Sequence, residues 1–378
     1  MRFVDEYRQL DTARTLIHRI SSQASRRWTL MEVCGGQTHS LMKYGLVELL
    51  EPFVSLIHGP GCPVCVTEAS YIDSAICLAR SSGVTLATFG DLMRVPGRSH
   101  SLLTAATDGA TVLPVYSPID AVRFASQHPN EQVVFFAVGF ETTVPATALA
   151  VKQAQQRKLT NFSVLNAHVR VLPAMSVMAQ EPARSLDGFL AAGHVCSVTG
   201  WKDYCSFAEQ YRIPVVVTGF EPVDLLLGIE QCVSLLEKGE PTAVNAYPRA
   251  VTLEGHSQTH ALISEVFLPA DREWRGLGRI PLGGFGFQPE YQQFDAQTQF
   301  DSLLNDAMGK AGNADASPDE SIDLRSSCIA GEILTGKRRP CECSHFGNAC
   351  TPETPLGAPM VSSEGACAAW FRYRPTAK

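Results

Sequence analysis

The apolar residues of this chain fall into short runs that alternate with stretches of helical spacing. Between Ala13 and Ala24 apolar residues recur every three or four positions, which predicts an amphipathic helix. From Trp28 onward the pattern changes to apolar runs that end in glycine-containing loops, such as "VSLIHGPG" at 54–61. Segments of helical spacing follow these runs. Such alternation of strands and helices predicts parallel α/β layers.

The same rhythm divides the chain into three regions. We expect one α/β domain at 25–121 and a second at 122–230. Residues 1–24 and 231–378 are assigned to a third, irregular region, because the rhythm is lost after residue 230 and the last 51 residues hold five cysteines. The segment 305–323 is polar and rich in small residues, which is typical of a surface stretch.

The composition is that of an ordinary globular protein, with 45% hydrophobic and 18% charged residues. A net charge of −7 and the lack of a long basic run argue against nucleic-acid binding. The longest apolar run, at 133–140, is too short to span a bilayer, and the acidic start does not resemble a signal peptide. We therefore expect a cytoplasmic protein, in which twelve cysteines indicate metal binding or redox chemistry.

Three cysteines fall on loops that follow predicted strands. Cys34 precedes two glycines and a helix start, and Cys62 and Cys65 flank a proline and a valine after a later strand. We expect these loops to line one crevice, because ligands of α/β sheets bind at the carboxyl ends of strands. A helix N-terminus lowers a thiol pKa, and a C-x-x-C pair is typical of a redox dithiol. The alternatives are buried structural thiols and, for the pair, half of a zinc site.

Other polar side chains on similar loops are further candidates. Asp91 and Arg94 either line the same crevice or form an ion pair within their own loop. Glu141 and Glu221 each end a Gly-Phe-Glu sequence after an apolar run, and they either face the crevice or cap helices. His194 follows small residues on another such loop, where a single histidine is more often structural than a ligand. Four further thiols are expected in the core: Cys77, Cys196, Cys205 and Cys232.

The C-terminal region holds four cysteines at the spacing C-x14-C-x6-C-x16-C: Cys328, Cys343, Cys350 and Cys367. A segment this rich in glycine and proline needs a covalent or metal staple to fold. Four thiolates suit tetrahedral zinc or an iron–sulfur cluster, and the wide spacing favours the cluster. Unligated thiols are the remaining alternative. Cys341 is an additional thiol beside this set and is an alternative ligand to Cys343.

Nine short motifs lie in order along nearly the whole chain. They are "MEVCGGQTH" (31–39), "IHGPGCPVCV" (57–66), "TFGDLMRVPG" (88–97), "GFETT" (139–143), "GFEP" (219–222), "EWRGLG" (273–278), "GEILTGK" (331–337), "HFGNACTPE" (345–353) and "MVSSEGACAAW" (360–370). Together they resemble the HypD family of [NiFe]-hydrogenase maturation factors. The resemblance implies two Rossmann-like parallel α/β domains and a third, irregular and mainly helical domain with a [4Fe-4S] cluster.

The resemblance also implies a function in the cytoplasm. Members of this family form a complex with the small partner HypC, and on that complex the Fe(CN)2CO unit is assembled before it passes to the large subunit of a hydrogenase. The cyanide arrives from a second pair of partners, HypE and HypF. We therefore expect an assembly scaffold with redox chemistry, in which a cluster exchanges electrons with a dithiol, rather than a turnover enzyme.

Residue by residue, the resemblance implies that Cys34 binds iron together with a cysteine of HypC. Cys62 and Cys65 correspond to the redox dithiol. The cluster ligands would be Cys328, Cys343, Cys350 and Cys367. Thiolates are soft ligands, which suit iron that carries cyanide and carbon monoxide.

His39, Asp91 and Glu364 also lie in family motifs and are candidate site residues, while Gln37 stands where many members have histidine. Two other functions use the same residues. One is a cluster-dependent disulfide reductase that acts on a soluble protein with rapid turnover. The other is a zinc-stabilised binding module without redox chemistry.

Overall fold

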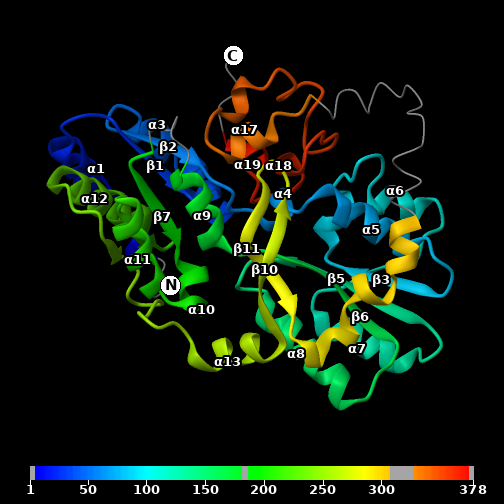
Figure 1. Ribbon diagram of the computed structural model, residues 1–378. Coiled ribbons are helices and arrows are strands. Elements are labelled where there is room, and N and C mark those ends of the chain that lie inside the picture. Colours follow the sequence, from blue (N-terminus) through cyan, green and yellow to red (C-terminus); the bar gives the residue numbers. More distant parts are fainter. Residues whose placement is uncertain (1–4, 181–185, 307–326, 374–378) are drawn as a thin grey trace.

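The computed structural model describes residues 5–180, 186–306 and 327–373 (Figure 1). Within them, the strands form two parallel sheets and one antiparallel pair. The five-stranded sheet has the order β2-β1-β7-β8-β9, and the four-stranded sheet has the order β4-β3-β5-β6. The predicted α/β class with parallel sheets is therefore confirmed.

The strands of the five-stranded sheet are β1 (Trp28–Glu32), β2 (Val54–His58), β7 (Gly188–Ala192), β8 (Val215–Thr218) and β9 (Ala243–Asn245). The four-stranded sheet holds β3 (Val84–Thr88), β4 (Val112–Pro114), β5 (Gln132–Gly139) and β6 (Phe162–His168). The antiparallel pair is β10 (Phe267–Trp274) and β11 (Gly278–Phe287).

The helices among the described residues are α1 (Leu10–Gln23), α2 (Gly35–Lys43), α3 (Leu46–Leu50), α4 (Pro63–Val66), α5 (Ala69–Ala79), α6 (Leu102–Thr107), α7 (Pro118–Gln127), α8 (Val144–Gln156), α9 (Val171–Gln180), α10 (Gly193–Thr199), α11 (Lys202–Tyr211), α12 (Pro222–Lys238), α13 (Ser257–Val266), α14 (Ala296–Gln299), α17 (Ala330–Leu334), α18 (Ala358–Val361) and α19 (Ala366–Tyr373). Four short 3₁₀ helices are η1 (Asp5–Arg8), η2 (Gly90–Arg94), η3 (Pro289–Phe294) and η4 (Pro340–Glu342).

Both faces of each parallel sheet are buried, which explains the continuous apolar runs in the sequence. Leu30 and Met31 of β1 point to opposite faces and enter different hydrophobic clusters. Phe135 and Phe136 of β5 divide in the same way. Neither face of these strands is free for solvent, so the pattern lacks the polar alternation of a half-exposed strand.

The two sheets do not follow the ranges 25–121 and 122–230. Each range contributes strands to both sheets, because the chain leaves the five-stranded sheet after β2, completes the four-stranded sheet from β3 to β6, and returns at β7. An apolar run shows that a strand is buried in a parallel sheet, but it does not show which strand lies beside it. Strand pairing therefore could not be obtained from the rhythm alone.

The two passages of the chain between the sheets are held together by the antiparallel pair β10–β11. Thr67, in the first passage, pairs with Trp274, and Val169, at the start of the second, pairs with Gly284. The β10–β11 pair thus lies beside both passages, in the middle of the molecule (Figure 1).

The two ends of the chain pack against the sheets at different places. Helix α1, which was grouped with the C-terminal region, packs against α12, where Leu16 and Ile20 join the same hydrophobic cluster as Ile229. The C-terminal helices lie between the two halves of the molecule (Figure 1), with α19 against α2 and α18 against α4. None of the helices among the described residues has the length and apolar character needed to cross a membrane.

Candidate functional site

The direction of chain progression reverses once in each parallel sheet. In the five-stranded sheet β1 lies between β2 and β7, so the loops after β1 and β7 flank the position where α/β proteins bind ligands. Cys34 follows β1, and His194 follows β7. In the four-stranded sheet the reversal lies between β3 and β5, which are followed by Asp91 and Glu141. Both reversals thus carry residues that the sequence had indicated.

Cys34 is buried at the N-terminus of α2, directly against the loop that follows β2. The N–H of Gly35 donates to the carbonyl oxygen of Gly61 at 2.9 Å. A Cβ atom on Gly61 would lie 2.1 Å from the backbone nitrogen of Cys34, which is far inside van der Waals contact. Only glycine permits this approach. The structure therefore brings the Cys34 loop and the loop of Cys62 and Cys65 together.

Cys62 and Cys65 form a disulfide across the start of the short helix α4, and both residues are buried. The Sγ atom of Cys65 lies 3.9 Å from the carbonyl oxygen of Ala358 in α18. A disulfide of this kind is a two-electron redox couple, and its sulfurs are not thiolates, the form that binds metals.

A C-terminal segment around α18 contacts the Cys34 loop, the disulfide and Cys328. A Cβ atom on Gly35 would lie 2.3 Å from the carbonyl oxygen of Glu364, so the Cys34 loop is packed against the backbone of this segment. A Cβ atom on Gly357 would lie 2.5 Å from the Sγ atom of Cys328. Since Gly357 precedes Ala358, two consecutive residues contact Cys328 on one side and the disulfide on the other.

A buried polar network supports the Cys34 loop from below. Glu32, at the end of β1, accepts a hydrogen bond from the N–H of Cys34 at 2.9 Å and another from the hydroxyl of Thr38. Its other contact is the Nδ1 atom of His58 at 2.7 Å, and the Nε2 atom of His58 accepts from the indole N–H of Trp370 at 2.6 Å. Sequence reasoning missed this network, although a glutamate inside the apolar run "TLMEVC" was a visible signal.

The pKa of the Cys34 thiol is raised, which differs from the sequence-based expectation. Burial is the main cause, and the negative charges of Glu32 and Glu364 raise the pKa further. Backbone N–H groups of Gln37 and Gly36 at the helix N-terminus lower it, but burial outweighs them. The thiol therefore keeps its proton at neutral pH.

His194 lies beside this thiol, although the sequence favoured a structural role for it. Its Nδ1 atom lies 3.7 Å from the Sγ atom of Cys34. Burial lowers the pKa of His194, so the imidazole is neutral, which is the form that binds metals. No local pattern separates His194 from a structural histidine, because β1 and β7 become neighbours only in the folded sheet.

Asp91 and Glu364 meet at a cavity of about 260 Å³ beside the disulfide helix. Pro63 and Val64 of α4 form one wall, and the end of β5 forms another. Burial and the negative charge of Asp91 raise the pKa of Glu364. Of the three candidates His39, Asp91 and Glu364, the last two thus lie next to α4, at the reversal of the four-stranded sheet.

Three other candidates have structural contacts. Arg94 donates to the carbonyl oxygens of Pro352 and Val361, so it fastens the C-terminal region instead of pairing with Asp91. His39 contacts the hydroxyl of Tyr373 at 3.0 Å, in the interface between α2 and α19. Two hydrogen bonds of Gln37 link α2 to the five-stranded sheet: its Nε2 atom donates to the hydroxyl of Thr218 and to the carbonyl oxygen of Ala191.

The four C-terminal cysteines of the predicted set act on one another electrostatically. Burial raises the pKa of Cys367, and the negative charges of Cys328, Cys350 and Cys343 raise it further. Burial also raises the pKa of Cys328, to which Cys350 and Cys343 contribute in the same direction. Such mutual effects require that these thiols share one neighbourhood.

Cys341 packs elsewhere, against the hydrophobic cluster of Leu16 and Trp370, and it is absent from the charges that act on Cys328 and Cys367. In the described part of the chain, no three His, Cys, Asp or Glu side chains are arranged to hold a metal ion. The donor set of four neighbouring thiols nevertheless fits an iron–sulfur cluster by its chemistry.

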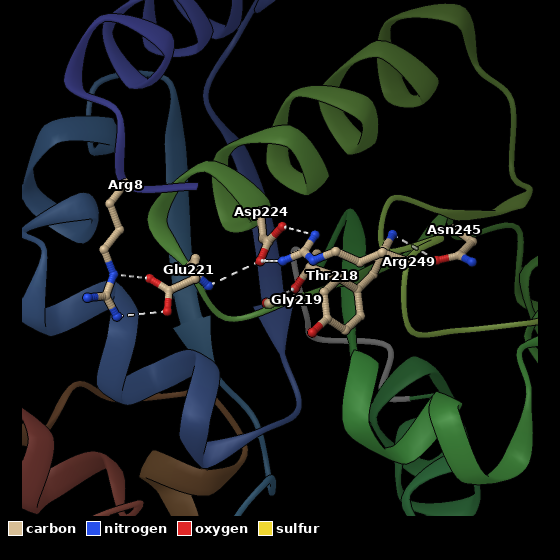
Figure 2. Close-up of polar contacts among 8 residues, drawn as sticks. Arg8, Thr218, Gly219, Glu221, Asp224, Asn245 and Arg249 are labelled. Carbon is tan, nitrogen blue, oxygen red and sulfur yellow. Dashed lines mark hydrogen bonds and ion pairs between the residues drawn. The ribbon is translucent and has the colours of Figure 1, made fainter. Parts of the chain in front are cut away.

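The two Gly-Phe-Glu loops have different surroundings. Glu221 precedes α12 and forms an ion pair with Arg8, whose Nη2 atom lies 2.8 Å from Oε1 (Figure 2). Asp224, one turn further, accepts from the N–H of Glu221 and pairs with Arg249 at 2.7 and 2.6 Å (Figure 2). Glu141 accepts instead from the N–H of Val171, at the start of α9. Both glutamates thus serve helix starts, which was one of the two alternatives.

We expect Arg249→Met to lower the free energy of unfolding by about 3 kcal/mol, because it leaves the carboxylate of Asp224, only 1% exposed, without its partner. Arg8→Met is the matched control. It breaks a pair whose side chains are 47% and 21% exposed, so the loss of stability should be much smaller than in Arg249→Met. Denaturant unfolding of both variants measures the difference, and equal losses would contradict the argument.

The fold and the site together define a class of protein: an α/β protein with a buried thiol and a disulfide at its strand ends and four further cysteines in its C-terminal segment. The family model "HypD: Hydrogenase formation hypA family" matches residues 11–374. The chain is 43% identical to "Hydrogenase maturation factor HypD" of Escherichia coli (strain K12), over 99% of this chain and 98% of the relative. It is 44% identical to the protein of that name from Azotobacter vinelandii, over 99% and 97%.

This chain therefore belongs to the HypD family of hydrogenase maturation factors. The resemblance that the nine motifs indicated is confirmed over the full length of the chain.

Proposed function

We propose that this protein is the scaffold on which the Fe(CN)2CO unit of a [NiFe]-hydrogenase is assembled, in complex with the small partner HypC. The iron unit is its cargo and is held between Cys34 and a thiol of the partner. The cyanide is delivered by HypE and HypF, and the whole process takes place in the cytoplasm. The observation that carries this proposal is the close approach of the Cys34 and Cys62 loops at Gly61.

The position of Cys34 supports a role in holding iron. The thiol lies at the reversal of the five-stranded sheet, with the neutral imidazole of His194 beside it. Cysteine sulfur and imidazole nitrogen are both ligands for iron. A buried thiol with a raised pKa gives up its proton to a metal and to little else, so the site discriminates against other reactions of a free thiol.

The disulfide supplies the redox capability. Reduction of the Cys62–Cys65 bond takes up two electrons and two protons and yields two thiols, and reoxidation returns them. Since this couple lies beside the Cys34 loop, electrons can be exchanged next to the bound iron. Asp91 and Glu364, on the other side of α4, are the nearby carboxyl groups that can take up or release protons.

The four thiols of the C-terminal region support the proposal of a [4Fe-4S] cluster held by Cys328, Cys343, Cys350 and Cys367. Such a cluster, when bound, supplies single electrons. Gly357 contacts the Cys328 thiol and Ala358 contacts the disulfide. Because glycine has no side chain and alanine has only a methyl group, Cys328 and the disulfide can lie close together.

Replacing any of these four cysteines by alanine should remove the visible absorption of thiolate-bound iron from the anaerobically purified protein. Cys341→Ala is the matched control, because this thiol packs against the hydrophobic residues around Leu16. The absorption should be retained in this variant. An absorption spectrum and an iron determination check this. Loss of iron in Cys341→Ala with retention in Cys343→Ala would show that Cys341, and not Cys343, is the fourth ligand.

The burial of the disulfide disfavours a disulfide reductase that acts on soluble proteins. Cys62 is 3% exposed and Cys65 is fully buried, so a protein dithiol has little access to either sulfur.

Anaerobic purification with HypC, followed by infrared and visible spectra of one sample, tests the scaffold proposal. Cyanide and carbonyl stretches on a brown protein would support it. A brown protein without these stretches that turns over a dithiol rapidly would favour the reductase, and a colourless zinc protein the binding module.

A further inference from the structure

A second cavity, of about 220 Å³, lies away from the thiol loops. Glu141 and Arg170, which follow β5 and β6, contribute from the four-stranded sheet. Tyr204 of α11 contributes from the five-stranded half, and His260 of α13 and Phe285 of β11 close the space. Cavities where two such units meet are common positions for ligands. A volume of this size corresponds to about seven water molecules, or to a small organic molecule.

Two buried polar atoms in this cavity lack a hydrogen-bond partner among the described residues. The carboxyl of Glu141, in a residue only 6% exposed, uses Oε1 to accept from the N–H of Val171, but Oε2 has no partner. The Nε2 atom of His260 is also buried and unpartnered. Buried polar groups are nearly always paired in folded proteins, so two orphaned atoms that line one cavity indicate a missing ligand.

The positive charge of Arg170 favours an anionic group beside it in this cavity. Arg170 lines the cavity, its Nη1 atom donates to the carbonyl oxygen of Leu282, and its guanidinium lies over the ring of Phe285. Burial raises the pKa of Glu141 to about 7, although Arg170 lowers it. The carboxyl therefore carries a proton in a large fraction of molecules at neutral pH, and it can donate that proton in a hydrogen bond.

We propose that this cavity binds a small carboxylate. Its oxygens accept hydrogen bonds from the Glu141 carboxyl and the His260 ring, Arg170 supplies the opposite charge, and Phe267 and Phe285 contact the carbon skeleton. The carboxylate belongs either to a simple acid or to an amino acid. Asp203 also lines the cavity and would pair with the ammonium group of an amino acid. This site is independent of the proposed scaffold function, because none of the thiol loops lines it.

Calorimetric titration of the full-length, cluster-loaded protein with acetate, glycine and ethylammonium chloride tests the proposal. We expect saturable binding of at least one carboxylate and none of ethylammonium. Tighter binding of glycine than of acetate, with the preference lost in Asp203→Asn, would identify an amino acid as the ligand. Binding of ethylammonium alone, or of none of the three probes, would overturn the proposal and leave the cavity to water.

Variants separate this site from a merely structural cavity. Arg170→Gln should weaken carboxylate binding at least about tenfold, as expected for one lost charge-assisted hydrogen bond. Glu141→Gln retains a donor at the same place and should bind within a few-fold of the parent protein, whereas Glu141→Ala should not. The exposed Arg157, at the end of α8, gives the matched control Arg157→Gln, which should bind normally. Unchanged binding in Arg170→Gln would refute the assignment. This variant should fold, because it removes one side-chain hydrogen bond to a backbone carbonyl and one contact with the Phe285 ring.

Discussion

Cys34→Ala should abolish the cyanide and carbonyl infrared bands expected of the proposed complex with HypC, while the visible absorption of the proposed cluster remains. The variant removes the thiol that follows β1 at the reversal of the five-stranded sheet, and the neighbouring His194 offers a single nitrogen. In the proposed function, iron with strong-field ligands depends on this soft thiolate. The four C-terminal cysteines are untouched by the change, so iron bound there should persist.

The appropriate control for this variant is Cys77→Ala. Cys77 is also a free cysteine and lies on α5, outside the loops of the candidate site. The same chemical change there should leave both the infrared bands and the visible absorption intact. Infrared spectra of the two variants, purified with HypC under identical conditions, decide the question. Persistence of the bands in Cys34→Ala would remove this thiol from the proposed function.

Gly61→Ala should lower the free energy of unfolding by about 3 kcal/mol and should also reduce iron retention. The new methyl group would meet the nitrogen of Cys34 at 2.1 Å and the carbonyl carbon of Val33 at 2.3 Å, both of them backbone atoms. Neither can move without displacing β1 or α2, so the two loops must separate. Separation breaks the hydrogen bond from Gly35 to Gly61 and shifts the Cys34 thiol away from the disulfide.

Gly90→Ala provides a control with the same change in composition. A Cβ atom at Gly90 meets nothing within 4 Å, so its unfolding free energy should stay within about 0.5 kcal/mol of the parent protein. Denaturant unfolding of both variants, with iron analysis of the folded fraction, gives the comparison. If Gly61→Ala unfolds like Gly90→Ala, the two loops are not in the close contact that the proposed function requires.

The sequence allowed the parallel α/β class and the placement of thiols on strand-end loops to be predicted, because both depend on local patterns. An apolar run followed by glycine is visible in one stretch of chain, as at Cys34. The partners of that stretch are not. His194 follows β7, 160 residues further along the chain, and it reaches Cys34 because β7 pairs with β1.

The pKa of Cys34 illustrates a second limit. The helix N-terminus that was expected to lower it is present, and its N–H groups do act in that direction. The sequence does not show how much protein covers the thiol, and here burial dominates. The roles assigned to the individual cysteines stay predictions until the variants above are measured.

The strand order has a consequence for the newly made chain. The four-stranded sheet uses strands from one continuous stretch, β3 to β6, and can form as soon as that stretch has emerged. The five-stranded sheet has to wait for β7, and the cover over its thiol loops waits for α18 and α19 at the far end. During synthesis Cys34 therefore meets His194 late and its C-terminal cover last. If Cys34 holds iron as proposed, loading depends on α18 and α19, and a chain truncated before them lacks the cover of the thiol loops.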